Sequence, residues 1–181
     1  MSIEPGRYAL GAGTAALTVR TGRRGAIARA GHDLRIEVEA WQATLALNDD
    51  VSQASVELTA DPHSLRVREG RGGMHPLGDE DRVAISQTID EEVLKGAAIA
   101  FRSRQVALAD NGGLFVAGDL QLAGVSRPIS FNLHVSDDGH VSASAVVKQT
   151  EWGIRPYTAL LGTLKVADEV HVSIDGRLTG S

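Results

Sequence analysis

His32 and Asp33 are adjacent in the sequence GHDLRIEV and come nearest, of all residues in the chain, to an acid–base pair. An imidazole oriented by a carboxylate can act as a general base, but it needs a nucleophile to activate. The chain has no cysteine, and none of its serines lies in a G-x-S-x-G turn. We therefore expect a structural hydrogen bond at His32, no catalytic residues and no enzyme activity.

The remaining histidines do not predict a metal site. They are scattered through the sequence without an i, i+4 pair, and there are no cysteines to complete a set of ligands. These residues are His63, His75, His134, His140 and His171. We expect no metal and no cofactor.

Two other short segments invite a chemical interpretation. The GRGG run at residues 70–73 is rich in glycine like a phosphate-binding loop, but it lacks the lysine and the Ser or Thr of that motif. Together with its neighbours it predicts a mobile surface loop over residues 68–78. The acidic run at residues 79–81 is expected to form the first turn of a helix, where negative charge is favourable.

Composition excludes several classes of partner. A chain of 181 residues with 43% hydrophobic and 23% charged residues is long enough for one domain, taken as 1–181. The net charge of -5 gives no reason to expect nucleic acid or an anionic lipid surface as a partner. No apolar run is long enough for an integral membrane segment, and the first twenty residues show no signal peptide, so a cytoplasmic location is expected.

The elements that position these residues are mostly strands, and residues 114–135 show this most clearly. Apolar residues alternate with polar ones in two runs joined by a turn at Gly124, which predicts an antiparallel hairpin with one buried face. Pro128 is expected to begin the second strand. The pattern predicts that the buried face includes Leu120, Phe131 and Leu133, and that the exposed face includes Gln121 and Asn132.

Similar alternation recurs along most of the chain. In residues 99–109 the apolar phase slips near Arg104, which predicts a β-bulge. Residues 79–95 break the alternation and predict one amphipathic helix, with Ile85 and Ile89 packed on the sheet. The fold class is therefore mainly β: an antiparallel, closed, lipocalin-like β-barrel of about eight strands with one amphipathic α-helix.

Small residues at inward positions indicate space inside this barrel. Barrels whose inward residues are undersized leave room for a ligand. The small residues in question are Ala43, Ala54, Gly118, Ala143 and Ala145. The alternative is that they let two sheets approach closely, in a β-sandwich or barrel that serves as an interaction module with a packed core and no small-molecule ligand.

The run GDLQLAGVSRPISF resembles the signature hairpin of the YceI-like family. The resemblance extends over nearly the whole chain, including GHDLRIEV, the central helix and ADEVHVSIDGRL. Many members carry an export signal and a His-Ser pair near the first strand, and neither is present here. Members of this family are lipocalin-shaped barrels that bind long isoprenoid lipids. The resemblance therefore implies a non-enzymatic protein that binds, sequesters or transports a long-chain isoprenoid-like lipid or isoprenoid quinone.

The candidate ligand-binding residues combine inward positions of the strands with the aromatic segment at residues 152–162. They are Phe101, Gly118, Leu120, Phe131, Ala145, Trp152, Arg155, Tyr157, Leu160 and Leu161. Plain core packing is the alternative for Trp152, Tyr157 and the two leucines. For a ligand with a phosphate, Arg155 and Arg71 are the loop cations expected to meet it, and surface ion pairing is the alternative for both. Pairing of barrels as a homodimer stays open.

Overall fold

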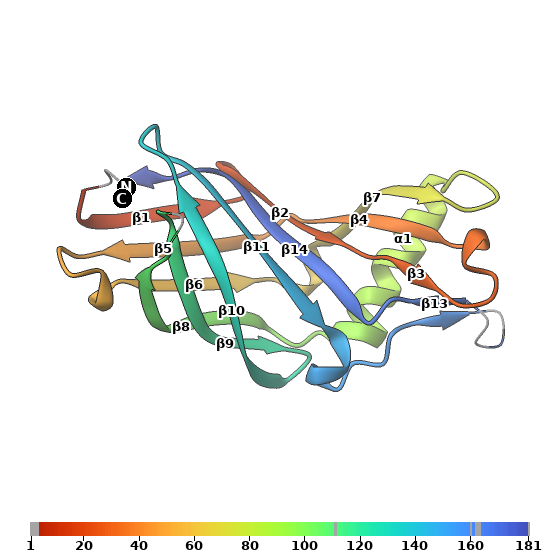
Figure 1. Ribbon diagram of the computed structural model, residues 1–181. Coiled ribbons are helices and arrows are strands. Elements are labelled where there is room, and N and C mark those ends of the chain that lie inside the picture. The colour runs from red at the N-terminus through yellow and green to blue at the C-terminus, as the bar shows by residue number, and fades with distance from the viewer. Residues whose placement is uncertain (1–3, 111, 160, 162–163, 181) are drawn as a thin grey trace.

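A computed structural model describes residues 4–110, 112–159, 161 and 164–180. Its main element is a twelve-stranded antiparallel sheet that curls around a long axis (Figure 1). The strands follow the order β15-β1-β5-β6-β8-β9-β10-β11-β14-β2-β4-β7, and a small second sheet has the order β12-β13-β3. Four pairs of neighbours in the main sheet, β5–β6, β8–β9, β9–β10 and β10–β11, are consecutive strands joined by short connections, and the other seven pairs join strands that lie further apart in the chain.

The bounds of the elements are as follows. The main sheet contains β1 (Gly6–Gly11), β2 (Ala15–Arg20), β4 (His32–Val38), β5 (Trp41–Leu47), β6 (Ser55–Ala60), β7 (Leu65–Gly72), β8 (Ile99–Leu108), β9 (Leu114–Leu122), β10 (Val125–Val135), β11 (His140–Lys148), β14 (Glu169–Arg177) and β15 (Thr179–Gly180). The small sheet contains β3 (Arg23–Arg24), β12 (Thr158–Ala159) and β13 (Leu164–Val166). The helical segments are η1 (Ala28–Ala30), η2 (Val51–Gln53), η3 (Pro62–Ser64), α1 (Asp79–Thr88), η4 (Ile89–Leu94) and η5 (Gln149–Trp152).

The sheet is an open half-barrel, so the predicted closed barrel of about eight strands is wrong in both closure and strand number. A closed barrel has no end strands, whereas this order begins at β15 and ends at β7. The strand β15 has only two residues, and the edge of β7 is covered by α1. The prediction of a closed barrel assumed that closure is needed to protect the strand edges. A covering helix also protects a strand edge, so a closed barrel is not required.

The β9–β10 hairpin has the predicted phase. Leu133 is buried, Leu120 and Phe131 are half-buried, and Gln121 and Asn132 are exposed. The turn consists of Ala123 and Gly124, which both have positive φ, as in the tight turns that suit twisted hairpins.

The start of the second strand of this hairpin differs from the prediction. The strand β10 begins at Val125, before Pro128. Pro128 lies where β10 pairs with β9 but not with β11, which is an edge position of the kind that tolerates proline.

The predicted bulge is confirmed at Arg104. Along the β8–β9 ladder, Ser103 faces Gly118 and Gln105 faces Ala117, so Arg104 is the extra residue. Its guanidinium Nε lies 2.6 Å from a carboxylate oxygen of Asp119 on the outer surface. The bulge explains why the apolar phase of this strand slips in the sequence.

The predicted helix is present, but it has two parts. The α-helix α1 ends at Thr88, and the chain continues as the π-helix η4 to Leu94 before Lys95 turns it in a left-handed conformation. Ile85 and Ile89 face the sheet, as predicted. Within the described ranges, no helix is long and apolar enough to cross a membrane.

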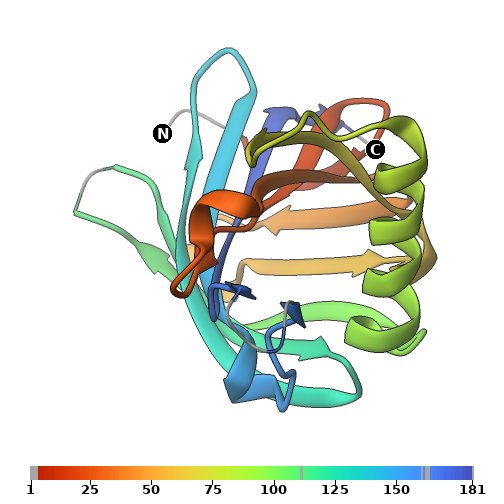
Figure 2. The ribbon, with the colours of Figure 1, turned by 90° about the vertical axis from the view of Figure 1, so that its right-hand side faces the viewer.

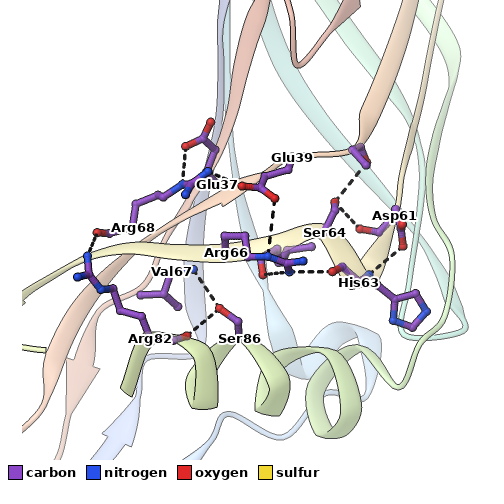
Figure 3. Close-up of polar contacts among 12 residues, drawn as sticks. Glu37, Glu39, Asp61, His63, Ser64, Arg66, Val67, Arg68, Arg82 and Ser86 are labelled. Atoms are coloured by element: carbon purple, nitrogen blue, oxygen red, sulfur yellow. Dashed lines mark hydrogen bonds and ion pairs between the residues drawn. The ribbon is translucent and has the colours of Figure 1, made fainter. Parts of the chain in front are cut away.

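Side chains of α1 bind the backbone of the end strand β7 (Figure 3). The Val67 N–H donates to Ser86 Oγ at 3.1 Å, and the Ser86 hydroxyl donates to the Arg82 carbonyl at 2.8 Å. Arg82 Nη1 in turn donates to the Arg68 carbonyl at 3.0 Å. Polar groups of the last strand therefore find partners on the helix, which fixes α1 along the open edge of the sheet.

The expected mobile loop over residues 68–78 is wrong in its first half. Residues up to Gly72 belong to β7 and pair with β4, and only residues 73–78 connect β7 to α1. Glycine is a weak strand former, which is why the GRGG run predicts a loop. Here the glycines are needed for close packing, because a Cβ at Gly70 would lie 2.2 Å from Leu77 Cδ1.

His63 joins the end of the helical segment to the β6–β7 connection. Its Nδ1 lies 2.7 Å from Oδ2 of Asp90. The hydrogen bond to Asp90 and the negative charge of that carboxylate raise the pKa of His63 above its ordinary value of 6.5. Stabilisation by this charged pair is complete below pH 6.5 and is lost as the pH rises through the raised pKa.

The His63 pair gives a testable pH dependence. We expect His63→Gln to lower the melting temperature below pH 6.5, and the difference from wild type to shrink at higher pH. The side chain of His63 is exposed, so the effect should be small. Thermal melts at several pH values measure it, and a difference that does not change with pH would contradict the assignment. Asp90→Asn should abolish the same pH dependence.

Candidate functional site

The curled sheet and its helix enclose a cavity of about 620 Å³. Its lining comes from inward positions of β1, β2, β4 to β6, β8 to β11 and β14, together with α1 and η4. Period-two alternation places one apolar face of each strand inside, and most of the lining side chains are aliphatic or aromatic. The volume lies in the range of roughly 300–1,000 Å³ that is typical of small-molecule sites.

Phe101, Leu120 and Phe131, all predicted ligand-binding residues, line the cavity. The rings of Phe101 and Phe131 pack against each other with centroids 5.3 Å apart and planes tilted by 55°. Phe131 is only half-buried although it faces inward, because one side of its ring borders the cavity rather than other side chains.

Small side chains do widen the interior. Ala43, Ala143 and Ala145 line the cavity, and Ala145 is the one named as a ligand-binding residue from the sequence. Ala54 belongs instead to a packed core cluster beside the cavity. Gly118 lies against the backbone of β8, where a Cβ would meet the Arg102 carbonyl oxygen at 2.2 Å, and it is not among the lining residues.

The aromatic segment divides between core and opening. Trp152 is 2% exposed and donates from its indole N–H to the Leu120 carbonyl at 2.9 Å, so it packs beside the sheet and does not line the cavity. Tyr157 lines the cavity at its open end and is half-exposed. Arg155 and Leu161 are exposed and lie outside the lining. Leu160 lies outside the described residues.

The polar part of the lining includes two cations that sequence reasoning missed, Arg23 and Lys165. They belong to β3 and β13 of the small sheet, at the end of the barrel shown facing the viewer in Figure 2. His32, at the start of β4, and Tyr157 complete this polar end, which we call the mouth. The sequence signal for the mouth is the basic pair in TGRRG, and this segment shows neither strand nor helix periodicity.

Hydrogen bonds and close packing hold the cation and the histidine of the mouth. Arg23 donates to the Gly31 carbonyl and its Nε lies 3.4 Å from a carboxylate oxygen of Asp33. His32 Nε2 lies 2.7 Å from the His75 carbonyl oxygen. A Cβ at Gly72 would strike the Arg23 guanidinium, and one at Gly73 would strike the His32 ring.

These contacts decide between the chemical interpretations of the mouth. Asp33 pairs with Arg23, and the described contact of the His32 ring is with a carbonyl, so the two residues do not form an oriented catalytic pair. The glycines of the GRGG run accommodate neighbouring side chains rather than cradle a phosphate. Arg71, the other cation considered for a phosphate, is 86% exposed and lies 3.7 Å from Glu69. In the part of the chain that the structure describes, no cluster of three or more acidic or histidine side chains could hold a metal ion.

A model of the YceI-like domain matches residues 17–178. The chain belongs to the YceI-like family. Among solved structures, BcnA of Burkholderia cenocepacia is 15% identical with a TM-score of 0.65, over 92% of this chain and 96% of that chain. The YceI protein of Campylobacter jejuni is 14% identical with a TM-score of 0.56, over 81% of this chain and 84% of that chain. Comparison with curated proteins gave no match.

At such low identity the two YceI-like structures share the fold of this chain and carry no information on its individual site residues. Both are covered over more than four fifths of their length by this chain. The chain therefore has a barrel-like YceI fold, and its lining residues have to be judged on their own positions.

Phe131→Ala should enlarge the cavity at a modest cost in stability. Removing a fully packed Phe costs roughly 3–5 kcal/mol. Phe131 already borders open space, so we expect its removal to cost less than about 3 kcal/mol in urea unfolding. A loss in the full range of a packed Phe would show that the ring is surrounded by protein. Leu114→Ala, at a fully buried position of β9 outside the cavity lining, is the control and should cost about 2–5 kcal/mol.

Proposed function

We propose that this protein binds a long apolar lipid of the isoprenoid or isoprenoid quinone class inside the cavity, without converting it chemically. The protein would then sequester or transport that lipid. The observation that carries this proposal is the lining: a cavity of about 620 Å³ walled mainly by aliphatic and aromatic side chains. The resemblance to isoprenoid-binding YceI-like proteins supports the choice of ligand class.

The energetics favour an apolar chain as the occupant. Each 100 Å² of apolar surface removed from water contributes about 2.5 kcal/mol, so a chain of modest length suffices for tight binding. A polar or charged ligand would lose its hydration in the aliphatic interior without gaining hydrogen bonds. The mouth provides Arg23, His32 and Lys165 for a polar head group, so the ligand would bind with its head outward.

An interaction module with a packed core is the competing function. Such a module would fill its interior with side chains to the density of an organic crystal. The cavity, and the alanines that border it, favour the binding protein instead. The two functions also differ in what a purified sample should contain.

Native mass spectrometry of protein purified without detergent tests the proposal. A retained apolar mass that disappears on denaturation supports it. After delipidation, a fluorescent isoprenoid should bind saturably at one molecule per chain, and a long-chain isoprenoid alcohol should compete more strongly than a fatty acid of similar length. No retained mass together with no saturable uptake would contradict the proposal and leave the interaction module.

A further inference from the structure

The loops at the mouth expose apolar side chains to solvent. Three connections meet at this end of the molecule: residues 21–31, residues 73–78, and the described residues of 153–166, namely 153–159, 161 and 164–166 (Figure 1). Each carries at least one large apolar side chain that is more than a third exposed: Ile27 at 40%, Met74 at 74%, Tyr157 at 49%, and Leu161, which is fully exposed. Isolated exposed apolar residues are common, but here each of the three connections at one opening has one.

The same connections are strongly basic. They contain five Lys or Arg residues and no Asp or Glu, although the whole chain has a net charge of -5. The five are Arg23, Arg24, Arg29, Arg155 and Lys165. The first acidic residues beyond them are Asp33, which pairs with Arg23, Asp79 at the start of α1, Glu151, and Asp168, whose pKa is lowered chiefly by a hydrogen bond from Thr150 and to a lesser extent by the charge of Arg24. The connections at the mouth thus carry a local excess of positive charge between acidic flanks, which the net charge of the whole chain does not reveal.

Two of these cations are held directly opposite each other. In the small sheet, Arg24 on β3 faces Lys165 on β13 across an antiparallel pair. Like charges in this arrangement repel and destabilise the pair. The carboxylate of Asp168 offsets part of this repulsion, since the charge of Arg24 contributes to lowering the pKa of Asp168, and an anionic surface in front of the mouth would relieve the rest.

We propose that the mouth docks onto the surface of an anionic lipid bilayer. Exposed apolar tips between basic residues are the combination with which peripheral proteins bind such surfaces: the tips enter the headgroup region, and the cations meet the lipid phosphates. The proposal rests on the proposed function, since docking would place the cavity opening against the membrane from which the lipid comes.

A bilayer fits these observations better than a protein partner or a second copy of the chain. The apolar tips come from three connections that also carry five basic residues, whereas the buried core of a protein interface is depleted of charged residues. A second copy meeting mouth to mouth would bring two basic surfaces together.

Sedimentation with lipid vesicles tests the docking. Delipidated wild type should bind vesicles of phosphatidylcholine and phosphatidylglycerol and bind pure phosphatidylcholine vesicles much more weakly. Salt should weaken the binding, since exposed charges are screened over about 10 Å at 0.1 M. Arg24→Gln with Arg29→Gln should lower the partition coefficient about 25-fold, or about fivefold for each cation. Met74→Asp should lower it about tenfold or more.

The control variants have the same chemistry away from the mouth. Arg102→Gln with Arg104→Gln removes two charges from the outer face of β8, and Leu108→Asp alters a residue that is 66% exposed at the end of the same strand. Both should bind vesicles nearly as wild type. Equal binding to both kinds of vesicle, equal losses in the controls, or a stable dimer that forms through the mouth in sedimentation would overturn the docking proposal.

Uptake of the fluorescent isoprenoid from solution separates the two proposals. The mouth variants should retain it, because Arg24, Arg29 and Met74 do not line the cavity. Vesicle binding by a protein that takes up no isoprenoid would uphold docking and contradict the proposed function. Isoprenoid uptake without any preference for anionic vesicles would support the proposed function and contradict docking.

Discussion

Ala145→Phe should abolish isoprenoid uptake while leaving the protein folded. Ala145 lies on β11 and lines the cavity, and its strand pairs with β14 opposite Val172, another lining residue. A phenyl ring at this position would occupy part of the space that the ligand needs. A lipid that is denied about 100 Å² of apolar contact loses about 2.5 kcal/mol, which is close to a hundredfold in affinity.

The control for this change is the next residue on the same strand. Val146 is 51% exposed on the outer face, so Val146→Phe adds a ring of the same size outside the barrel and should leave uptake unchanged. Melting temperature and fluorescent isoprenoid uptake should be measured for both variants. If Ala145→Phe instead loses about 1–3 kcal/mol of stability, the ring has been forced into a packed core and the cavity is not accessible in solution.

Alternation in the sequence predicts local structure well in this fold, because each strand has one inward and one outward face. The phase of the β9–β10 hairpin and the bulge at Arg104 both follow from counting apolar positions. The helix is found in the same way, from the change of period. The widening from α-helix to π-helix at Ile89 leaves no mark in that pattern, since the apolar positions stay on one face.

The alternation of apolar and polar residues does not show which strands, far apart in the sequence, pair with each other in the sheet. The openness of the sheet depends on whether the end strands β15 and β7 meet, and alternation is the same in closed and open barrels. The mouth could not be predicted from the sequence for a related reason. Arg23 and Lys165 come together only because β3 pairs with β13, and both strands are too short to show a period.

Glycine residues lead to two opposite errors in the prediction. Glycines within a strand are predicted to form a loop, and a tightly packed glycine is predicted to leave space in the cavity. The GRGG run predicts a loop by propensity, yet two of its glycines are part of β7, where they leave room for Leu77 and the Arg23 guanidinium. Gly118 predicts space in the cavity because it shares the inward phase of its strand. That space is filled by the backbone of the neighbouring strand, which is visible only once the bulge has been placed.

Gly118→Ala should therefore destabilise the fold strongly, although it adds a single methyl group. An alanine Cβ would lie 2.2 Å from the Arg102 carbonyl oxygen and 2.7 Å from Ser103 Cα, and both are backbone atoms. The strand β8 has little freedom to move away, because Ser103 Oγ accepts a hydrogen bond of 2.9 Å from the Val56 N–H on β6. We expect a loss of about 3 kcal/mol or more, at or above the upper end of the usual range for overpacking.

Gly13→Ala is the matched control for this prediction. Its Cβ would meet nothing within 4 Å, and its backbone does not require glycine, so the change should alter stability by less than about 1 kcal/mol. Urea unfolding of the two variants gives the comparison, with soluble yield as a second measurement if Gly118→Ala does not fold. Equal stability of the two variants would mean that β8 and β9 do not approach as closely at the bulge as the structure has them. The bulge itself would then have to lie elsewhere, and with it the change of phase that turns Phe101 and Val106 toward the interior.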